Sequence, residues 1–245
     1  MRVKVRTFSG VVCEQEVFSV SDRIKNIKNA EPRERFKNEE ERARHRWLMS
    51  RRHHARVFNS TFSPQSLYST LTMDDAHEVH TFQEARKIRD LYTRRLQRTN
   101  PDAQIMIYMG RGKSTSRIHF HMVSNGLDEK TILSKWREGD IKEIKPLRAH
   151  NYYDGVDCGQ DYTGLANYLF DHWTPEQGER THKYKPINVC QPEREKPTEA
   201  KRSYSESRPP VAPKGYRLVQ CTSDKFGHFC FKYIKDVDIP PYRKR

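Results

Sequence analysis

The sequence predicts an α+β protein with a mainly antiparallel sheet and helices packed on it. Apolar residues alternate in several short segments, as in strands, and recur at spacings of three and four in others, as in amphipathic helices. The predicted order is strand, helix, strand, strand, helix, strand, helix, and a tight loop joins two of the strands. This succession favours an α+β fold with antiparallel pairing.

The N-terminal part of the chain combines a faint hairpin signal with a charged helix. Residues 1–30 hold short apolar runs that fit an edge hairpin, and residues 31–58 read as a helix rich in Arg, Glu and His. At roughly 100° per residue, one face of this helix collects Ala43, Trp47, His54 and Phe58. The opposite face collects Arg42, Arg46, Arg52 and Arg56. This arginine face is either a solvated surface or a set of contacts to nucleic-acid phosphates.

The middle of the chain carries the clearest periodicity. Residues 67–72 alternate and are rich in β-formers, so they predict a strand. Residues 78–99 form an amphipathic pattern that ends at an Asn-Pro pair, which predicts a helix. Residues 104–109 and 118–123 predict two further strands. The loop between them, residues 110–116, reads as a hairpin turn because it lacks the spacing of a phosphate-binding loop.

Shorter elements follow. Asp128 can cap a short helix that ends at Gly139, and residues 141–144 predict a strand. Residues 160–173 predict another helix, and residues 229–234 a last strand. We therefore divide the chain into four parts. These are a basic N-terminal extension (1–66), a central domain (67–192), a Pro-rich charged linker or arm (193–215), and a C-terminal strand with a basic tail (216–245).

Composition points to a polyanionic partner. The 245 residues include 46 Lys plus Arg and 32 Asp plus Glu, a net charge of 46 − 32 = +14, and only 34% are apolar. Such a surplus favours contacts to phosphates and predicts nucleic acid as the partner. The five cysteines are odd in number and form no CxxC pair, and no segment has the length and apolarity of a membrane span. We expect a soluble protein of a reducing cytoplasm.

Two histidines in one predicted strand are the first candidate site. In Ile118-His119-Phe120-His121-Met122-Val123 the histidines are two residues apart, so both side chains point to the same face of a sheet. Two imidazoles on one face of a rigid strand can chelate a divalent metal. Alone, the pattern is weak, because paired histidines on strands more often pack across strands or lie on the surface.

A tyrosine on the helix predicted at 160–173 is the second candidate. Helical geometry puts Tyr162 in the apolar stripe of this helix and Tyr168 about a third of a turn away from it. We therefore expect Tyr162 in the core and Tyr168 at a more accessible position, either as a rim residue or as a nucleophile that attacks a phosphodiester.

These residues resemble the rolling-circle replication initiators of the HUH endonuclease superfamily, which occur in phages and small plasmids. Residues 118–123 match the His-hydrophobic-His motif, and Leu71-Thr72 looks like the first motif of the family. Ala166-Asn167-Tyr168-Leu169-Phe170-Asp171 lies where the family has its nucleophile helix. The turn at residues 136–139 also resembles a subgroup of these initiators. The resemblance covers approximately residues 67–192.

The resemblance implies a ferredoxin-like (RRM-like) sheet that carries a DNA-nicking site. His119 and His121 would hold Mg²⁺ or Mn²⁺, and Tyr168 would attack the scissile phosphate. The products would be a 5′-phosphotyrosine link and a 3′-OH for rolling-circle replication. The implied partners are single-stranded or hairpin origin DNA and the host polymerase and helicase, in a bacterial cytoplasm. Further candidate nucleic-acid contacts near the histidines are Arg111, Lys113 and Arg117.

The chain departs from the family in two places. The family usually has a third metal ligand, whereas residues 106–113 offer no carboxylate; His77, Glu78 and His80 are possible substitutes. The family often has a Lys three residues after the tyrosine, and this chain has Asp171. With one well-placed tyrosine, re-ligation would need Tyr162, a second protomer or water.

The main alternative is a non-catalytic protein that binds single-stranded nucleic acid on an RRM-like sheet. In that case Tyr108 and Phe120 would stack on bases, and the basic residues would hold phosphates. A histidine-triad hydrolase is disfavoured because Val123 takes the place of the third alternating histidine.

Overall fold

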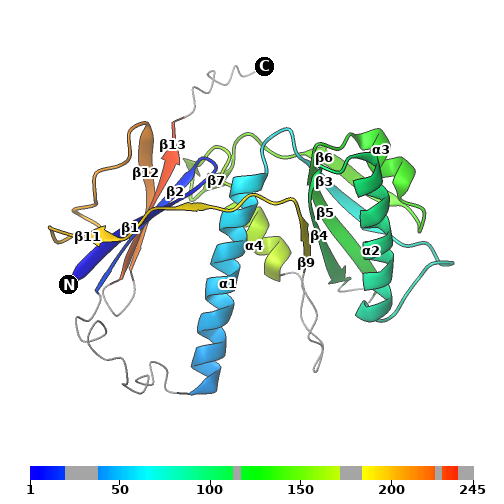
Figure 1. Ribbon diagram of the computed structural model, residues 1–245, viewed down its shortest axis with the longest axis horizontal. Helices are drawn as coiled ribbons and strands as arrows, with labels where there is room; N and C mark the ends of the chain where they lie inside the picture. Colours follow the sequence, from blue (N-terminus) through cyan, green and yellow to red (C-terminus); the bar gives the residue numbers. More distant parts are fainter. Residues whose placement is uncertain (20–37, 113–116, 172–183, 224–227, 237–245) are drawn as a thin grey trace. The chain divides into compact units, whose positions relative to one another are not determined.

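The computed structural model describes residues 1–19, 38–112, 117–171, 184–223 and 228–236. It has α+β composition with antiparallel strand pairing, as predicted from the sequence. The chain divides into two compact units, each with its own sheet (Figure 1). Unit 1 comprises residues 1–56, 150–161 and 192–245, and unit 2 comprises residues 57–149 and 162–191.

Unit 2 holds a five-stranded antiparallel sheet in the order β6-β3-β5-β4-β9. Its strands are β3 (Leu67–Thr72), β4 (Gln104–Arg111), β5 (Ile118–Asn125), β6 (Ile141–Pro146) and β9 (Tyr184–Ile187). The strand β5 is central, between β3 and β4. With α2 (Phe82–Thr99) and α3 (Glu129–Lys135), the first four strands follow one another as β3-α2-β4-β5-α3-β6.

Both of these helices begin at side-chain caps that are visible in the sequence. The Thr81 hydroxyl accepts a hydrogen bond from the Glu84 N–H at 3.2 Å, and the Glu84 carboxylate accepts one from the Thr81 N–H at 3.3 Å. The Asp128 carboxylate accepts from the Thr131 N–H at 2.8 Å, as predicted for the start of α3. These bonds satisfy N–H groups that have no partner inside a helix.

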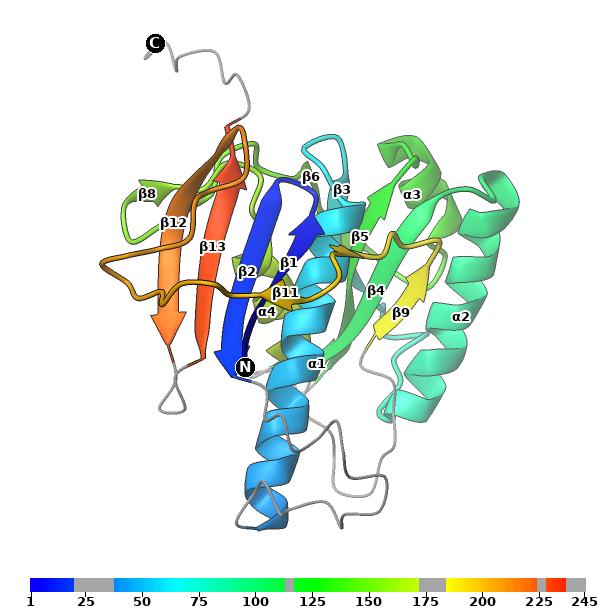
Figure 2. The same ribbon diagram turned by 60° about the vertical axis from the view of Figure 1, so that its left-hand side comes forward.

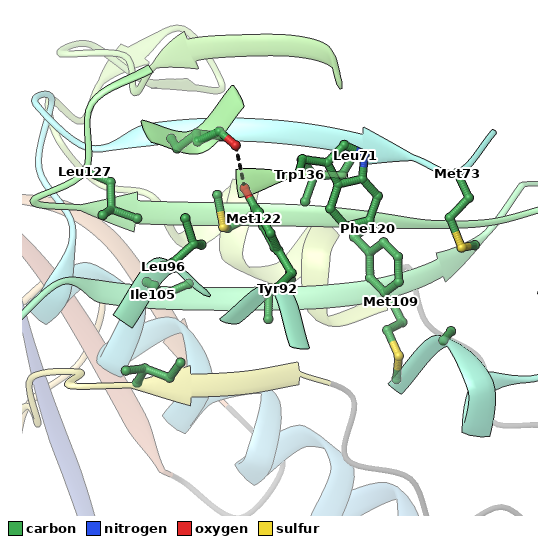
Figure 3. Close-up of a cluster of buried hydrophobic side chains, with 14 of the residues drawn as sticks. Leu71, Met73, Tyr92, Leu96, Ile105, Met109, Phe120, Met122, Leu127 and Trp136 are labelled. Carbon is green, nitrogen blue, oxygen red and sulfur yellow. Dashed lines mark hydrogen bonds between the residues drawn. The ribbon is translucent and has the colours of Figure 1, made fainter. Parts of the chain in front are cut away.

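The helices α2 and α3 pack on one face of the sheet, and the main core of unit 2 lies between them and the strands (Figure 3). Leu71, Phe120 and Met122 point into this core from β3 and β5. Tyr92 crosses it from α2, and its hydroxyl donates to the Ile132 carbonyl at 3.1 Å. Because side chains alternate along a strand, the residues next to Phe120 face the other side of the sheet.

The other face of this sheet carries α4 (Thr163–Asp171) and the last turn of α1 (Glu39–Thr61) (Figure 1). Asn59 joins the two helices: its Oδ1 accepts from the Tyr162 N–H at 2.8 Å, and its Nδ2 donates to the Thr163 hydroxyl at 3.1 Å. The rings of Phe58 and Tyr162 meet edge to face at 6.2 Å between centroids. The end of α1 therefore fixes the position at which α4 begins.

Unit 1 contains a six-stranded antiparallel sheet (Figure 2). The order is β10-β1-β2-β13-β12, and β11 also pairs with β1. Its strands are β1 (Arg2–Ser9), β2 (Val12–Ser19), β10 (Glu193–Arg194), β11 (Thr198–Glu199), β12 (Tyr216–Ser223) and β13 (Phe229–Lys235). A small hairpin of β7 (Tyr152–Tyr153) and β8 (Val156–Asp157) completes the unit.

The composition of unit 1 differs from the linear division that the sequence suggested. The predicted extension supplies β1 and β2, and the predicted C-terminal strand, β13, pairs with β2. The Pro-rich segment 193–215 contributes β10 and β11, and the Pro210 carbonyl accepts a hydrogen bond from the buried Tyr233 hydroxyl at 2.9 Å. These segments form one sheet because their apolar faces share a core that includes Cys13, Val17, Phe231 and Tyr233.

The four arginines predicted on one face of the first helix have different environments. Arg52 and Arg56 each contact both Glu14 and Glu16 of β2, at 2.5 to 3.3 Å, and their side chains are 25% and 13% exposed. Arg42 and Arg46 are exposed and contact Glu39 at 3.3 and 2.6 Å. Within α1, therefore, the predicted arginine face is solvated only in its N-terminal half. Its C-terminal half attaches the helix to the sheet of unit 1.

The predicted apolar stripe of this helix is likewise buried only in part. His54 and Phe58 are buried, whereas Ala43 and Trp47 are exposed. Among the described residues, no helix combines the length and the apolar composition needed to cross a membrane.

Candidate functional site

The two histidines lie side by side on β5, on the face of the sheet opposite α2. His119 is half-buried and His121 is buried. Their Nε2 atoms are 3.2 Å apart, and the rings meet edge to face with centroids 4.9 Å apart. The predicted orientation of both side chains to one face is therefore confirmed.

Cross-strand neighbours on β3 surround the pair. Thr70 lies opposite His121, and Thr72 opposite His119. The Tyr68 hydroxyl lies 2.7 Å from Nδ1 of His121. The Thr70 hydroxyl donates to the Tyr68 hydroxyl oxygen at 3.3 Å. Burial raises the pKa of the Tyr68 phenol despite the hydrogen bond from Thr70, so Tyr68 is protonated at neutral pH.

The helix α4 presents Tyr168 to the same place. Its ring centroid lies 6.4 Å from that of His121, and its side chain is 53% exposed. Tyr162, by contrast, is buried against Phe58. The predicted distinction between a core tyrosine and an accessible one is thus confirmed.

His119, His121 and Tyr168 line one cavity of about 640 Å³ within unit 2. The other ionisable groups of its lining are Asp74, Asp75, Asp140, Arg117 and Lys142. With neutral histidines, three carboxylates and two cations give a formal charge of −3 + 2 = −1. The lining is therefore slightly acidic, which favours a bound cation.

The turn between α3 and β6 precedes two residues of the cavity lining, Asp140 and Lys142. Gly139 has φ +148°, and a Cβ at this position would lie 2.4 Å from the Thr72 carbonyl oxygen. Glu138 is buried in a paired contact with Arg95, at 2.7 and 2.9 Å, and the Trp136 indole N–H donates to the Thr72 carbonyl at 3.2 Å. The turn thus lies directly against the end of β3 and holds Asp140 and Lys142 at the rim.

The donors present fit a divalent transition metal. Two nitrogens that bind one ion at about 2.1 Å are separated by roughly 3.0 to 3.4 Å, for octahedral to tetrahedral angles. The Nε2 atoms of His119 and His121 are 3.2 Å apart, within this interval. Imidazole suits transition ions better than Mg²⁺, which prefers oxygen. Of the two metals expected, Mn²⁺ therefore suits this pair better.

The structure does not identify a third ligand. Within the described ranges, no group of three His, Cys, Asp or Glu side chains is arranged to hold a metal. The substitutes suggested by the sequence do not line the cavity. His77 contacts Asp74 at 2.7 Å, Glu78 contacts Arg117 at 2.9 Å, and the His80 carbonyl accepts from Arg111 at 3.0 Å.

The basic residues predicted near the histidines also differ in their surroundings. Arg117 lines the cavity and forms ion pairs with Asp75 and Glu78. Arg111 lies over the Phe82 ring at 5.3 Å and does not line the cavity. Lys113 lies outside the residues that the structure describes.

Sequence reasoning missed Tyr68, Asp140 and Lys142. Tyr68 was visible as an alternating residue of the same strand as Thr70, so its face followed from periodicity, but its partner depends on the register with β5. Asp140 and Lys142 reach the cavity through the turn at Gly139 and an irregularity in the pairing of β3 with β6. No periodic signal encodes either of these features.

The two residues proposed to stack on bases in the binding-only alternative are buried. Tyr108 is 1% exposed and Phe120 is 0% exposed. Phe120 packs into the core against Trp136, on the α2 side of the sheet. Neither ring is placed for stacking on a nucleic-acid base, so this part of the alternative is wrong.

Comparison of the chain with protein-family models, curated proteins and solved structures found no match to any of them.

Proposed function

We propose that unit 2 nicks single-stranded DNA and becomes covalently attached to it through Tyr168, as a rolling-circle replication initiator does. The observation that carries the proposal is the meeting of His119, His121 and Tyr168 in one cavity. These residues come from segments about 50 positions apart in the sequence, yet they combine a candidate metal site with a candidate nucleophile.

We also propose that unit 2 belongs to the ferredoxin-like class. Two features support this: the succession β3-α2-β4-β5-α3-β6 and the antiparallel order β6-β3-β5-β4. In this arrangement β5 is a central strand, and one of its faces is covered by α2 and α3. The histidines therefore stand on a rigid support, on the opposite face.

In the proposed step, the Tyr168 hydroxyl oxygen forms a bond to the scissile phosphorus and the bond from phosphorus to the 3′-oxygen breaks. The phenolic proton passes to water, which is accessible because Tyr168 is half-exposed, and the leaving 3′-oxygen takes up a proton. The products are a 5′-phosphotyrosine and a 3′-OH. A divalent metal held by His119 and His121 would offset the charge that accumulates on the phosphate.

Lys142 is the residue best placed to contact the phosphate directly. It lines the cavity and makes no ion pair with the residues that the structure describes, whereas Arg117 is engaged with two carboxylates. We propose that Lys142 supplies the cation that the family often places three residues after the tyrosine, where this chain has Asp171. Because the lining has a formal charge of −1, phosphate binding at this site should need the metal as well.

The proposed partners are single-stranded or hairpin origin DNA, and the host polymerase and helicase that would extend and unwind from the 3′-OH. The net charge of +14 supports a polyanionic substrate. The buried rings of Tyr108 and Phe120 give the binding-only alternative less support than the nicking reaction.

The test is formation of an adduct. Purified protein is incubated with Mn²⁺ and circular single-stranded DNA, and a set of labelled hairpins serves as a second substrate. We expect nicking and a protein–DNA product that survives SDS. Tyr168→Phe should abolish this product and leave DNA affinity unchanged, because only the nucleophilic oxygen is removed.

Tyr162→Phe is the matched control. The Tyr162 hydroxyl is buried and has no hydrogen-bond partner among the described residues, so its removal should not change adduct formation. An adduct with Tyr168→Phe would show that the nucleophile is another residue. Binding without nicking by the wild type, with every metal and substrate tried, would favour the binding-only alternative.

A further inference from the structure

Tyr68 makes a close polar contact with one histidine of the pair from outside the cavity. It lies on β3, beside β5, and its side chain is almost fully buried. Its hydroxyl oxygen is 2.7 Å from Nδ1 of His121, and the two rings are stacked at 5.8 Å and 21°. Tyr68 does not line the cavity; it contacts His121 and Thr70, and the Thr70 hydroxyl oxygen lies 3.4 Å from the same Nδ1 of His121.

This contact bears on which nitrogen of His121 carries the hydrogen. A neutral imidazole has one N–H and one nitrogen with a lone pair, and only the latter can bind a metal. The oxygen of Tyr68 has two lone pairs and can accept from both the Thr70 hydroxyl, at 3.3 Å, and an Nδ1–H of His121. With the hydrogen on Nδ1, the lone pair of His121 is on Nε2, the atom that faces His119.

We propose that Tyr68 is a positioning residue that holds His121 in the Nδ1–H tautomer, with its Nε2 lone pair directed into the cavity. The inference rests on the proposed function of the histidine pair as a metal site. It adds a hydrogen-bond acceptor behind one ligand, and such acceptors fix the orientation of the ring and strengthen the ligand.

The tautomer of His121 also determines that of its neighbour in the metal-free protein. The contact of 3.2 Å between the two Nε2 atoms is a hydrogen bond only if one of them carries hydrogen. With His121 protonated on Nδ1, the hydrogen belongs to Nε2 of His119. Only His119, on the more exposed side of the pair, then has to change tautomer when a metal binds.

The first measurement needs neither metal nor DNA. Imidazole ¹⁵N shifts of metal-free wild type, assigned by loss of the signal in His121→Gln, distinguish a protonated Nδ1 from a protonated Nε2. We expect Nδ1–H at His121. A spectrum with the hydrogen on Nε2 of His121 overturns the proposal, whether or not Tyr68→Phe folds.

The second measurement is the affinity for Mn²⁺, by calorimetry or electron paramagnetic resonance. Tyr68→Phe keeps the ring and removes the acceptor, and we expect affinity to fall about 10- to 100-fold. Tyr108→Phe is the control: Tyr108 lies opposite His121 on β4 and is also buried, and its hydroxyl contacts the Met106 sulfur, at 3.1 Å. This control should bind Mn²⁺ as the wild type does.

The two proposals fail in different ways. If the wild type binds no Mn²⁺, the metal site of the proposed function is wrong, and the ¹⁵N spectrum alone decides the role of Tyr68. If the wild type binds Mn²⁺ and Tyr68→Phe binds it equally well, the proposal for Tyr68 is wrong and the metal site stands. Equal losses in Tyr68→Phe and Tyr108→Phe would also count against a specific role.

Discussion

Replacement of Arg56 by Met should destabilise unit 1 and leave DNA binding unchanged. Arg56 contacts Glu14 at 2.5 Å and Glu16 at 3.2 Å, and Arg52 contacts the same two carboxylates. The four groups balance at zero charge, and Arg56→Met leaves them at −1. Loss of one partner from a buried ion pair costs about 3 to 5 kcal/mol. Because Arg56 is 13% and Glu14 17% exposed, we expect about 3 kcal/mol, at the lower end.

That loss corresponds to a decrease in Tm of about 6 to 12 °C for a transition that involves 150 to 250 residues. Thermal unfolding followed by circular dichroism measures the decrease in Tm. The matched control is Arg46→Met, on the same helix, where the partner Glu39 and Arg46 itself are 67% and 61% exposed. An exposed pair of this kind adds little to stability, so we expect no measurable change in the midpoint.

Binding of single-stranded DNA should show the reverse pattern. If Arg46 contacts a phosphate, Arg46→Met weakens binding and lowers the salt slope by roughly 0.7. Arg56→Met should bind DNA normally at temperatures where it is folded. Unfolding of Arg56→Met at the wild-type midpoint, together with a loss of DNA affinity, would show that Arg56 faces phosphate rather than the sheet.

Three further outcomes are expected. Lys142→Ala should slow single-turnover adduct formation about 10²-fold without changing Mn²⁺ affinity, since it removes a cation from the phosphate and not a metal ligand; a parallel loss of Mn²⁺ would contradict this. Gly139→Ala should destabilise unit 2 by about 1 to 3 kcal/mol or more, because its Cβ would overlap the backbone at the end of β3. An unchanged urea midpoint would show that the backbone of the turn shifts to accommodate the methyl group. Burial alone would raise the pKa of Glu14, but Arg52 and Arg56 outweigh it and hold the pKa below the usual 4.5. Glu14 therefore stabilises unit 1 above pH 4.5, and this contribution is lost as pH falls through the lowered pKa. Glu14→Gln should therefore reduce the loss of stability that occurs as pH falls below 4.5. If the stability of this variant depends on pH as that of the wild type does, Glu14 does not have this role.

Elements with a strong local pattern could be predicted from the sequence. The strand β3 has the predicted bounds, and β5 extends two residues beyond the prediction. The helix α2 begins later than predicted, at Phe82, because the capping box at Thr81 determines its start. In these segments, periodicity and caps are properties of neighbouring residues, so one sequence is sufficient.

Elements that depend on distant partners could not be predicted in the same way. The two-residue strands β10 and β11 are strands only because they pair with β1, some 190 positions away. The ion pairs of Arg52 and Arg56 likewise require β2 beside the helix, and the helical pattern alone equally suited a solvated face. Strand formation and ion pairing of this kind are decided by tertiary context rather than by local preference.

The candidate site combines both kinds of information. The alternation of β5 is enough to place His119 and His121 on one face, and the helical period is enough to separate Tyr168 from Tyr162. Their meeting in one cavity depends on Asn59, which fixes the start of α4 from the end of α1. The nucleophile and the histidines are thus held by independent supports, the one by a helix junction and the other by a central strand. A substitution at Asn59 should therefore displace Tyr168 without altering Mn²⁺ affinity. A substitution at Tyr68 should lower Mn²⁺ affinity without displacing Tyr168.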